Sequence, residues 1–273
     1  MSSAPLRKRK RSPVKEKEKG NVHVQFPAGR PIMVAGPTGC GKTCWVQKLL
    51  SNRNNFTEPV RHILYCYGVY QPRFTEMKRT IPNLTFHSGL PSKDTVKQFD
   101  QHNVLDVIVL DDLMEKILDN ISAQALFTKY CHHYNISTIF ITQNVMAQGR
   151  CARNISLNTL ILVVFQNHRD KNQALSLAKQ QSPRNPDLFL QAFEDATCTP
   201  HGYLVVDCTP QCDNAKRWRT DIFTNEGLGK VGGKCYRINN RSIFVSPINA
   251  QFHGSSPQLD SSNPAKRRKR NHG

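Results

Sequence analysis

Residues 36–43 read Gly36-Pro37-Thr38-Gly39-Cys40-Gly41-Lys42-Thr43, and they match the pattern G-x-x-x-x-G-K-[ST] at each of its fixed positions. An apolar run, 32–35, stands before them, and the segment 44–50 that follows has the composition of a helix. A buried strand, a tight glycine-rich loop and a helix form the context in which this pattern binds nucleotides. Backbone N–H groups of such a loop surround phosphate oxygens, and the helix N-terminus adds the positive end of its dipole. The pattern therefore predicts that all eight residues bind a nucleotide.

Two adjacent acids follow a second apolar run and complete the expected chemistry. Residues 104–110 are almost continuously apolar, and Asp111 and Asp112 come directly after them. In this chemistry the lysine of the loop reaches the β- and γ-phosphates, and the threonine hydroxyl binds Mg²⁺. We therefore assign phosphate binding to Lys42, and Mg²⁺ binding to Thr43 together with Asp111, the latter acting through water. Asp112 is then placed to orient or deprotonate the attacking water.

Further polar residues are candidates for sensing and for transition-state stabilisation. The apolar run 136–142 ends in Gln143 and Asn144, which could contact the γ-phosphate or its water and respond to phosphate loss. Hydrolysis of a bound nucleotide also needs a positive charge at the transition state, which in ring-shaped assemblies is often supplied by a neighbouring subunit. The arginines that follow candidate strand ends are Arg150, Arg153 and Arg169, of which Arg153 and Arg169 are preferred.

Hydrophobic periodicity predicts alternating strands and helices over about 30–210. Strands are expected at 31–35, 61–67, 84–87, 104–110, 136–142, 159–165, 202–207 and 218–223. Helices are expected from the loop to 50 and at 73–79, 92–100, 122–133, 169–181 and from 186 onward. This order predicts an α/β fold with a mostly parallel central sheet and helices on both faces. Ligands of such sheets bind at the carboxyl ends of the strands, where the polar residues are Asp111, Asp112, Gln143, Asn144 and Asn167.

Positive charge is concentrated at the two ends of the chain. The net charge is +18, and residues 1–20 hold eight lysines and arginines against two glutamates. Another basic run occupies 266–270. We interpret 1–21 and 227–273 as disordered basic tails around one domain, 22–226. Such tails serve nuclear import or bind phosphate backbones, and the basic domain between them favours a nucleic acid as partner.

Several classes of protein are disfavoured by composition. No run reaches the eighteen or more apolar residues of a membrane span, and the basic N-terminus lacks the apolar core of a signal peptide. A soluble, intracellular protein without a membrane partner is expected. The nine cysteines show no paired spacing. Only Cys198, Cys208 and Cys212, with His201 nearby, deserve comparison with a zinc site, and reduced thiols fit their spacing better.

Four segments taken together carry a resemblance to a known family: 36–43, 107–114, 139–144 and 165–170. They resemble the genome-packaging ATPases of double-stranded DNA viruses and virus-like transposons, in the poxvirus-type branch of the FtsK–HerA group found in Polinton- and adintovirus-like elements. The resemblance covers about 30–225. The family more often has Glu at the position of Asp112, and its arginine finger has no local motif that can be matched here.

The resemblance implies an ASCE, RecA-like three-layer fold in which the strand ending in Gln143 lies between the loop strand and the strand ending in Asp111. It also implies ATP and Mg²⁺ as cofactors and a homo-oligomeric ring that pumps double-stranded DNA into a capsid. A viral capsid or portal protein is then a partner. The basic ends of the chain place such a protein in the host nucleus, with an association with virions.

Other functions remain open at this stage. An AAA-type, helicase-like ATPase acting on DNA would use the same residues. In a non-hydrolysing DNA-binding packaging or transcription factor the nucleotide would be structural only. A GTPase is disfavoured because His168 stands where the guanine-selecting Asn-Lys-x-Asp motif has Lys. A nucleotide kinase would need an arginine-rich lid, and no segment resembles one.

Overall fold

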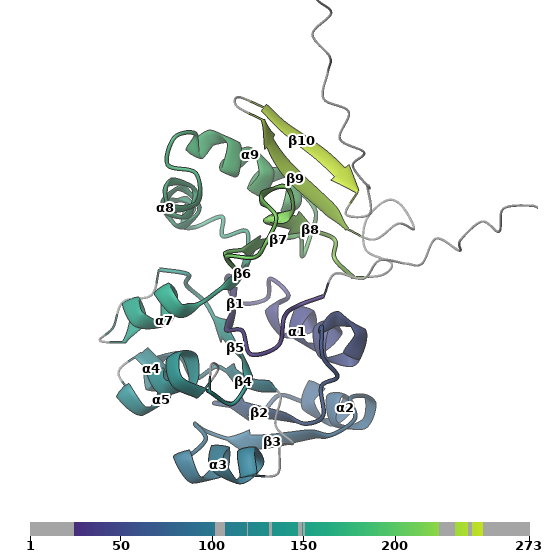
Figure 1. Cartoon of the computed structure of the whole chain (residues 1–273), viewed down its shortest axis with the longest axis vertical. Coiled ribbons are helices and arrows are strands. Elements are labelled where there is room, and N and C mark those ends of the chain that lie inside the picture. Colours follow the sequence, from purple (N-terminus) through teal and green to yellow (C-terminus); the bar gives the residue numbers. More distant parts are fainter. Residues whose placement is uncertain are drawn as a thin grey trace, which may run out of the picture.

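The computed structural model describes residues 25–101, 107–118, 120–130, 133–146, 149, 151–223, 233–239 and 242–247. One ten-stranded sheet runs through these residues in the order β10-β9-β8-β7-β6-β1-β5-β4-β2-β3 (Figure 1). The strands are β1 (Ile32–Ala35), β2 (Ile63–Tyr67), β3 (Leu84–Ser88), β4 (Val107–Asp111), β5 (Ser137–Thr142), β6 (Ile161–Phe165), β7 (Tyr203–Asp207), β8 (Trp218–Thr220), β9 (Lys234–Asn239) and β10 (Ser242–Pro247).

The sheet is mixed, so the expectation of a mostly parallel sheet is wrong. The six strands from β6 to β3 are parallel to one another, as predicted for this half. From β6 to β10, each neighbouring pair is antiparallel. Parallel neighbours need a crossover connection, usually a helix, whereas short connections join antiparallel strands. The described parts of the segments that follow β7 contain no α-helix, in agreement with the antiparallel pairing beyond β7, whereas two helices, at 171–181 and 186–196, separate β6 from β7, where the direction changes.

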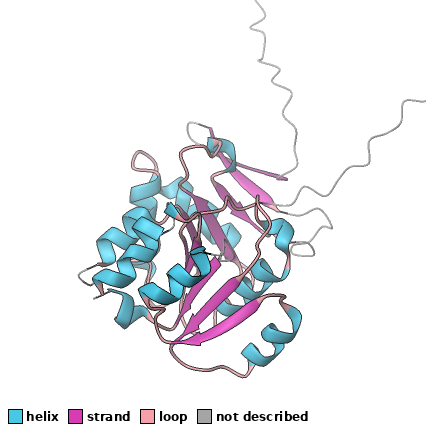
Figure 2. Ribbon diagram, turned by 60° about the horizontal axis from the view of Figure 1, so that its bottom comes forward, coloured by secondary structure: helices cyan, strands magenta, loops and turns pink. Residues whose placement is uncertain are grey.

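Helices cover both faces of the sheet, as predicted. Buried residues of α1 (Lys42–Ser51) and α2 (Arg73–Thr80) pack on one face. The opposite face is covered by α3 (Lys93–Gln101), α4 (Met114–Leu118), α5 (Ile121–Ala125) with its π-helical continuation (Leu126–Tyr130), α7 (Ala152–Asn158), α8 (Lys171–Gln181) and α9 (Pro186–Ala196). Figure 2 shows these layers from another direction. None of the described helices is long and apolar enough to cross a membrane.

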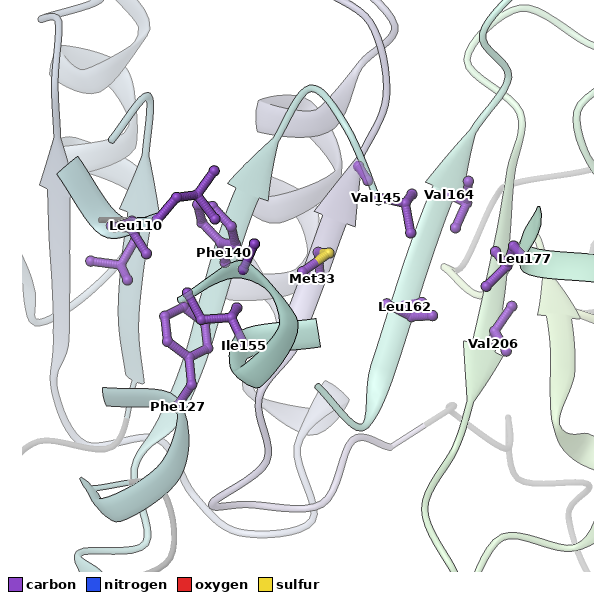
Figure 3. Close-up of a cluster of buried hydrophobic side chains, with 14 of the residues drawn as sticks. Met33, Leu110, Phe127, Phe140, Val145, Ile155, Leu162, Val164, Leu177 and Val206 are labelled. Carbon is purple, nitrogen blue, oxygen red and sulfur yellow. The ribbon is translucent and has the colours of Figure 1, made fainter. Parts of the chain in front are cut away.

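The core owes its two halves to the alternation of side chains along each strand. In β1, Ile32 and Val34 pack with α1, while Met33 faces the other layer. Figure 3 shows the second layer, in which Met33 lies between Phe140 of β5 and Leu162 of β6. These strands are buried on both faces, which explains their continuous apolar sequences.

The strand order around the glycine-rich loop agrees with the resemblance. β5 pairs in parallel with β1 on one side and with β4 on the other. The residue after β5 is Gln143, and β4 ends in Asp111. The strand that ends in an acid is therefore separated from the loop strand by the strand that precedes Gln143.

The predicted C-terminal boundary at 226 lies too early in the chain. β9 and β10 form an antiparallel hairpin that continues the sheet beyond β8. Cys235 and Tyr236 of β9 are buried, and the Tyr236 hydroxyl donates a hydrogen bond of 2.6 Å to Asp195 of α9. Glycine and polar residues around these strands obscured the pattern in the sequence. The basic tail predicted at 1–21 and the basic run 266–270 lie outside the described residues.

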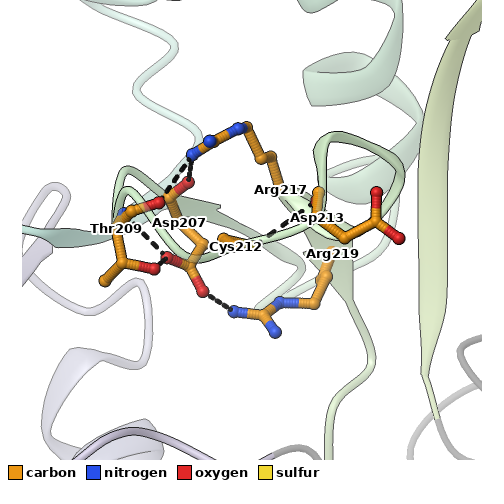
Figure 4. A network of polar contacts seen from close by, with 6 residues as sticks. All are labelled: Asp207, Thr209, Cys212, Asp213, Arg217 and Arg219. Atoms are coloured by element: carbon orange, nitrogen blue, oxygen red, sulfur yellow. Dashed lines mark hydrogen bonds and ion pairs between the residues drawn. The ribbon is translucent and has the colours of Figure 1, made fainter.

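A buried ion pair fixes the connection between β7 and β8 (Figure 4). Arg219 Nη2 lies 2.7 Å from Asp207 Oδ2, and the Thr209 hydroxyl donates to the other carboxylate oxygen at 2.6 Å. Arg217 donates to the backbone oxygens of Asp207 and Thr209 at 3.0 Å each. Because the two charges are paired and both carboxylate oxygens of Asp207 accept hydrogen bonds, these side chains can be buried at the end of β7, although Arg219 Nε has no hydrogen-bond partner.

The cysteines weighed as a zinc site do not converge. Cys198 and His201 precede β7 and Cys208 follows it, so this five-residue strand lies between them. Burial raises the pKa of Cys212 to about 11, which favours a protonated thiol. Within the described residues, no group of three or more His, Cys, Asp or Glu side chains is placed to hold a metal ion.

Candidate nucleotide-binding site

The loop between β1 and α1 has a backbone that only glycine accommodates at several positions. Gly39 and Gly41 have φ angles of 82° and 110°, in the left-handed region that disfavours side chains. A Cβ atom on Gly36 would lie 2.7 Å from Phe165 Cβ and 2.8 Å from Cys40 Sγ. The glycines of the sequence pattern are therefore required by the loop conformation and by its close packing against the end of β6.

Lys42 is the first residue of α1, and its ammonium group folds back over the loop. Nζ donates hydrogen bonds of 2.7 Å and 2.8 Å to the backbone oxygens of Gly36 and Pro37. Burial lowers the pKa of Lys42, while the negative charges of Asp111 and Asp112 raise it. The ammonium group therefore lies at the glycine-rich loop and within electrostatic reach of both acids.

Asp111 is a buried carboxylate at the end of β4, with only 4% of its surface exposed. Oδ2 accepts a hydrogen bond of 2.7 Å from the Tyr65 hydroxyl of the neighbouring strand β2. Burial raises the pKa of Asp111, while hydrogen bonds from Tyr65 and Thr43 and the charge of Lys42 lower it. The Thr43 hydroxyl and the Asp111 carboxylate are thus neighbours, as predicted for a pair that holds Mg²⁺. Their oxygen atoms are the hard ligands that this ion prefers.

Asp112 is exposed and has an unusual backbone conformation. Its φ angle is 54°, which is uncommon for a residue with a side chain and is found more often at functional sites. Gly68, after β2, packs directly against it: a Cβ atom there would lie 2.0 Å from the Asp112 backbone oxygen. The Gly68 N–H also donates a hydrogen bond of 2.9 Å to Asp111 O. The end of β2 thereby holds the Asp111–Asp112 turn in place.

A cleft of about 990 Å³ joins the predicted groups. Its lining includes Lys42, Thr43, Asp111, Asp112 and Gln143. This size lies at the upper end of the range for small-molecule sites, which is enough for a nucleoside triphosphate. The chain therefore brings together the glycine-rich loop, an oxygen pair suited to Mg²⁺, a second carboxylate and an amide.

Of the polar residues that follow β5 and β6, one lines the cleft and the others stabilise their own turns. Gln143 lines the cleft, whereas Asn144 Oδ1 accepts a hydrogen bond of 2.7 Å from Met146 N within its own turn. Asn167 does the same after β6, accepting a hydrogen bond of 3.0 Å from Arg169 N. Only Gln143 of these three is placed to contact a bound nucleotide, so the predicted polar pair is reduced to one residue.

A hydrogen-bonded residue of α8 holds the turn after Gln143. Gln173 Oε1 accepts a hydrogen bond of 3.3 Å from Val145 N. Its Nε2 donates one of 2.8 Å to Asp170 Oδ2, immediately before α8. The turn that follows β5 is therefore joined to the first turn of α8.

The candidate arginine fingers do not line this cleft. Arg153 lies on α7 and Arg169 between β6 and α8, and both side chains are exposed. Arg150 lies outside the described residues. A catalytic role of Arg153 or Arg169 would therefore have to be exerted on the cleft of another subunit, and it stays a prediction.

Three residues that sequence reasoning missed contact the site from distant segments. Tyr65 holds Asp111, as described above. His201, before β7, places Nδ1 3.0 Å from Cys40 O and lines the cleft. Arg73, at the start of α2, also lines the cleft and donates a hydrogen bond of 2.7 Å to Cys44 Sγ. A tyrosine within the apolar run 61–67 was the available signal for Tyr65; the other two had none.

Comparisons with known proteins give a distant likeness in fold. No family model and no curated protein matches the chain. Among solved structures, the genome packaging NTPase B204 from Sulfolobus turreted icosahedral virus 2 in complex with ATP-gammaS matches with a TM-score of 0.46 and 10% identity, covering 67% of this chain and 95% of that chain. Its complex with AMPPCP matches with a TM-score of 0.44 and 12% identity, covering 67% and 94%.

The B204 DNA-packaging ATPase from Sulfolobus turreted icosahedral virus matches with a TM-score of 0.46 and 10% identity, covering 68% of this chain and 95% of that chain. At this degree of overlap the likeness carries no conclusion about chemistry. The function therefore has to be inferred from the residues of this chain.

Proposed function

We propose that this protein is an ATP-driven motor that translocates double-stranded DNA and packages the genome of a virus or virus-like element. The observation that carries the ATPase part is the convergence of the Thr43 hydroxyl and the Asp111 carboxylate in a cleft that also contains Lys42. A loop that merely joined a strand to a helix would not need an acid brought to it from a strand two positions away in the sheet.

Each residue has a defined part in hydrolysis. Lys42 and the loop N–H groups bind the phosphates. Thr43 and Asp111 hold Mg²⁺, which when bound neutralises charge on the phosphate oxygens. Asp112 orients the water and accepts its proton, and Gln143 contacts the γ-phosphate and responds when it leaves.

The DNA-related part of the proposal is supported by charge and by the sequence resemblance. The net charge of +18 favours a polyanion as partner. The resemblance to the FtsK–HerA group, in its poxvirus-type and Polinton-type branch, motivates a homo-oligomeric ring and a capsid or portal partner. The basic ends of the chain motivate import into the host nucleus.

ATP hydrolysis with and without duplex DNA tests the proposal. Lys42→Ala and Asp112→Asn should abolish a DNA-stimulated turnover, and Asp112→Asn should still bind ATP. Lys179→Ala and Asp187→Asn serve as matched controls, since both residues are exposed on helices outside the cleft lining. Turnover that persists unchanged in Lys42→Ala and Asp112→Asn would refute the assigned site.

Binding to DNA and assembly are tested separately. Binding should be indifferent to sequence and should weaken with salt, because phosphate neutralisation releases counterions. Deleting 1–21 or the run 266–270 should weaken it, whereas equal affinity after truncation would assign these ends to import alone. Particle size measured with an ATP analogue and DNA distinguishes a ring from a monomer.

A further inference from the structure

Arg73 is an arginine of the cleft whose position is fixed by the packing of α2. It is the first residue of that helix, and the next residue, Phe74, is 1% exposed. The ring of Phe74 stacks on Phe86 of β3 with centroids 4.9 Å apart, and it also contacts Tyr65 at 5.2 Å. Met77, one turn further, is fully buried. The backbone that carries Arg73 is therefore anchored next to the strand that positions Asp111.

The guanidinium group reaches the first turn of α1. Nη1 lies 2.7 Å from the sulfur of Cys44, the residue that follows Thr43. Burial and the charge of Asp111 raise the pKa of Tyr65, and the positive charge of Arg73 lowers it. The contact with Cys44 thus places this cation beside the first turn of α1, next to Thr43, in the cleft that Asp111 also lines.

This cation is only weakly compensated by the protein. Within the described part of the chain, no carboxylate forms an ion pair with Arg73, and the sulfur of Cys44 is a weak acceptor. A guanidinium has five N–H donors. Arg219, by contrast, is paired directly with a buried carboxylate. A half-buried guanidinium with unused donors in a phosphate-binding cleft is suited to an oxyanion.

We propose that Arg73 binds the γ-phosphoryl group of the nucleotide held by its own chain and stabilises the charge that develops during its transfer to water. This inference rests on the proposed ATPase function. In the step, the water oxygen forms a bond to the γ-phosphorus, the bond from that phosphorus to the β-phosphate oxygen breaks, and Asp112 takes the water proton. The guanidinium acts in cis, in contrast to the roles considered for Arg153 and Arg169.

Steady-state kinetics of Arg73→Ala, Arg73→Lys and the control Arg79→Ala test this role. Arg79 is an exposed arginine in the last turn of the same helix, so its loss controls for net charge and for α2. Loss of a transition-state donor should lower the kcat of Arg73→Ala by about 10²–10³-fold. Arg73→Lys keeps the positive charge but cannot form bidentate hydrogen bonds with a phosphate, so it should retain part of the rate. Arg79→Ala should match the wild type.

A second measurement separates catalysis from folding. The wild type should bind ADP with Mg²⁺ and aluminium fluoride, a transition-state mimic, far more tightly than ADP alone. Arg73→Ala should bind ADP as the wild type does and lose the additional affinity. Equal kcat and equal affinity for the mimic in wild type and Arg73→Ala would overturn the inference.

The two proposals fail in distinguishable ways. If the wild type hydrolyses ATP, Lys42→Ala does not, and Arg73→Ala matches the wild type, only the role of Arg73 is refuted. If the wild type neither hydrolyses ATP nor binds the mimic, the ATPase function is refuted, and the role of Arg73 with it.

Discussion

Replacing Gly68 by alanine should impair catalysis, although the new side chain would not contact the nucleotide. Gly68 does not line the cleft, but it packs against the backbone of the Asp111–Asp112 turn. Its φ angle is outside the left-handed region, so the backbone itself tolerates alanine. The effect of the substitution therefore comes from the added methyl group alone.

The size of the effect follows from one distance. The new Cβ would lie 2.0 Å from Asp112 O, and contacts of real Cβ atoms are almost never shorter than 3.0 Å. The turn and the end of β2 must therefore separate by about 1 Å, and a misplacement of that size can reduce kcat about 10²-fold. Overpacking of this kind also lowers the free energy of unfolding by about 1–3 kcal/mol.

Three measurements and one control make the test specific. The affinity for ADP should stay within about threefold of the wild type, because the loop and Lys42 are not displaced. The kcat should fall and the thermal unfolding midpoint should decrease. Val69→Ala removes a neighbouring side chain that is 62% exposed and should change none of the three.

A Gly68→Ala variant with wild-type kcat would refute the reasoning, because it would mean that the position of Asp112 does not limit the reaction. An equal loss of kcat in Val69→Ala would refute it as well, by assigning the effect to the loop as a whole.

Three further predictions concern buried polar groups. Tyr65→Phe removes the 2.7 Å hydrogen bond to Asp111 and should raise the Mg²⁺ concentration for half-maximal turnover about tenfold, whereas Tyr67→Phe should not. Burial raises the pKa of Asp111 above its ordinary value of 3.8. At pH values between 3.8 and the raised pKa, the folded chain keeps a proton that the unfolded chain releases. The free energy of unfolding of the wild type therefore falls as the pH rises through this range. In urea unfolding without Mg²⁺, Asp111→Asn should therefore gain stability relative to wild type from acidic to neutral pH; a constant difference would contradict this. Arg219→Met leaves Asp207 without its ion-pair partner and should lower the free energy of unfolding by about 3–5 kcal/mol. The control Lys234→Met loses only the partly exposed pair with Asp221 and should cost at most about 1 kcal/mol.

The parts of the fold that sequence could predict are those set by local patterns. The glycine-rich loop with its strand and helix follows from residues within one short segment. The buried strands around it are recognisable because their apolar sequences have no polar face. The site residues that follow those strands could be named for the same reason, since the carboxyl ends of parallel strands meet at one edge.

The parts that sequence could not predict depend on contacts between distant segments. The antiparallel hairpin β9–β10 is stabilised by burial against residues far back in the chain, including Asp195, and its own composition resembles a tail. Arg73 and His201 reach the cleft because α2 and the segment before β7 pack where they do. No pattern within either segment marks them, because the sequence does not show which elements pack beside the glycine-rich loop.

Gln173 has a mechanical consequence for a motor. Its two hydrogen bonds couple the turn that follows Gln143 to the start of α8, which packs on the face of the sheet opposite α1. If Gln143 contacts the γ-phosphate as proposed and shifts when it leaves, either these bonds break, at about 1 kcal/mol each, or α8 moves with the turn. In the second case, the departure of phosphate from the cleft would displace α8 on the opposite face of the sheet in the same subunit.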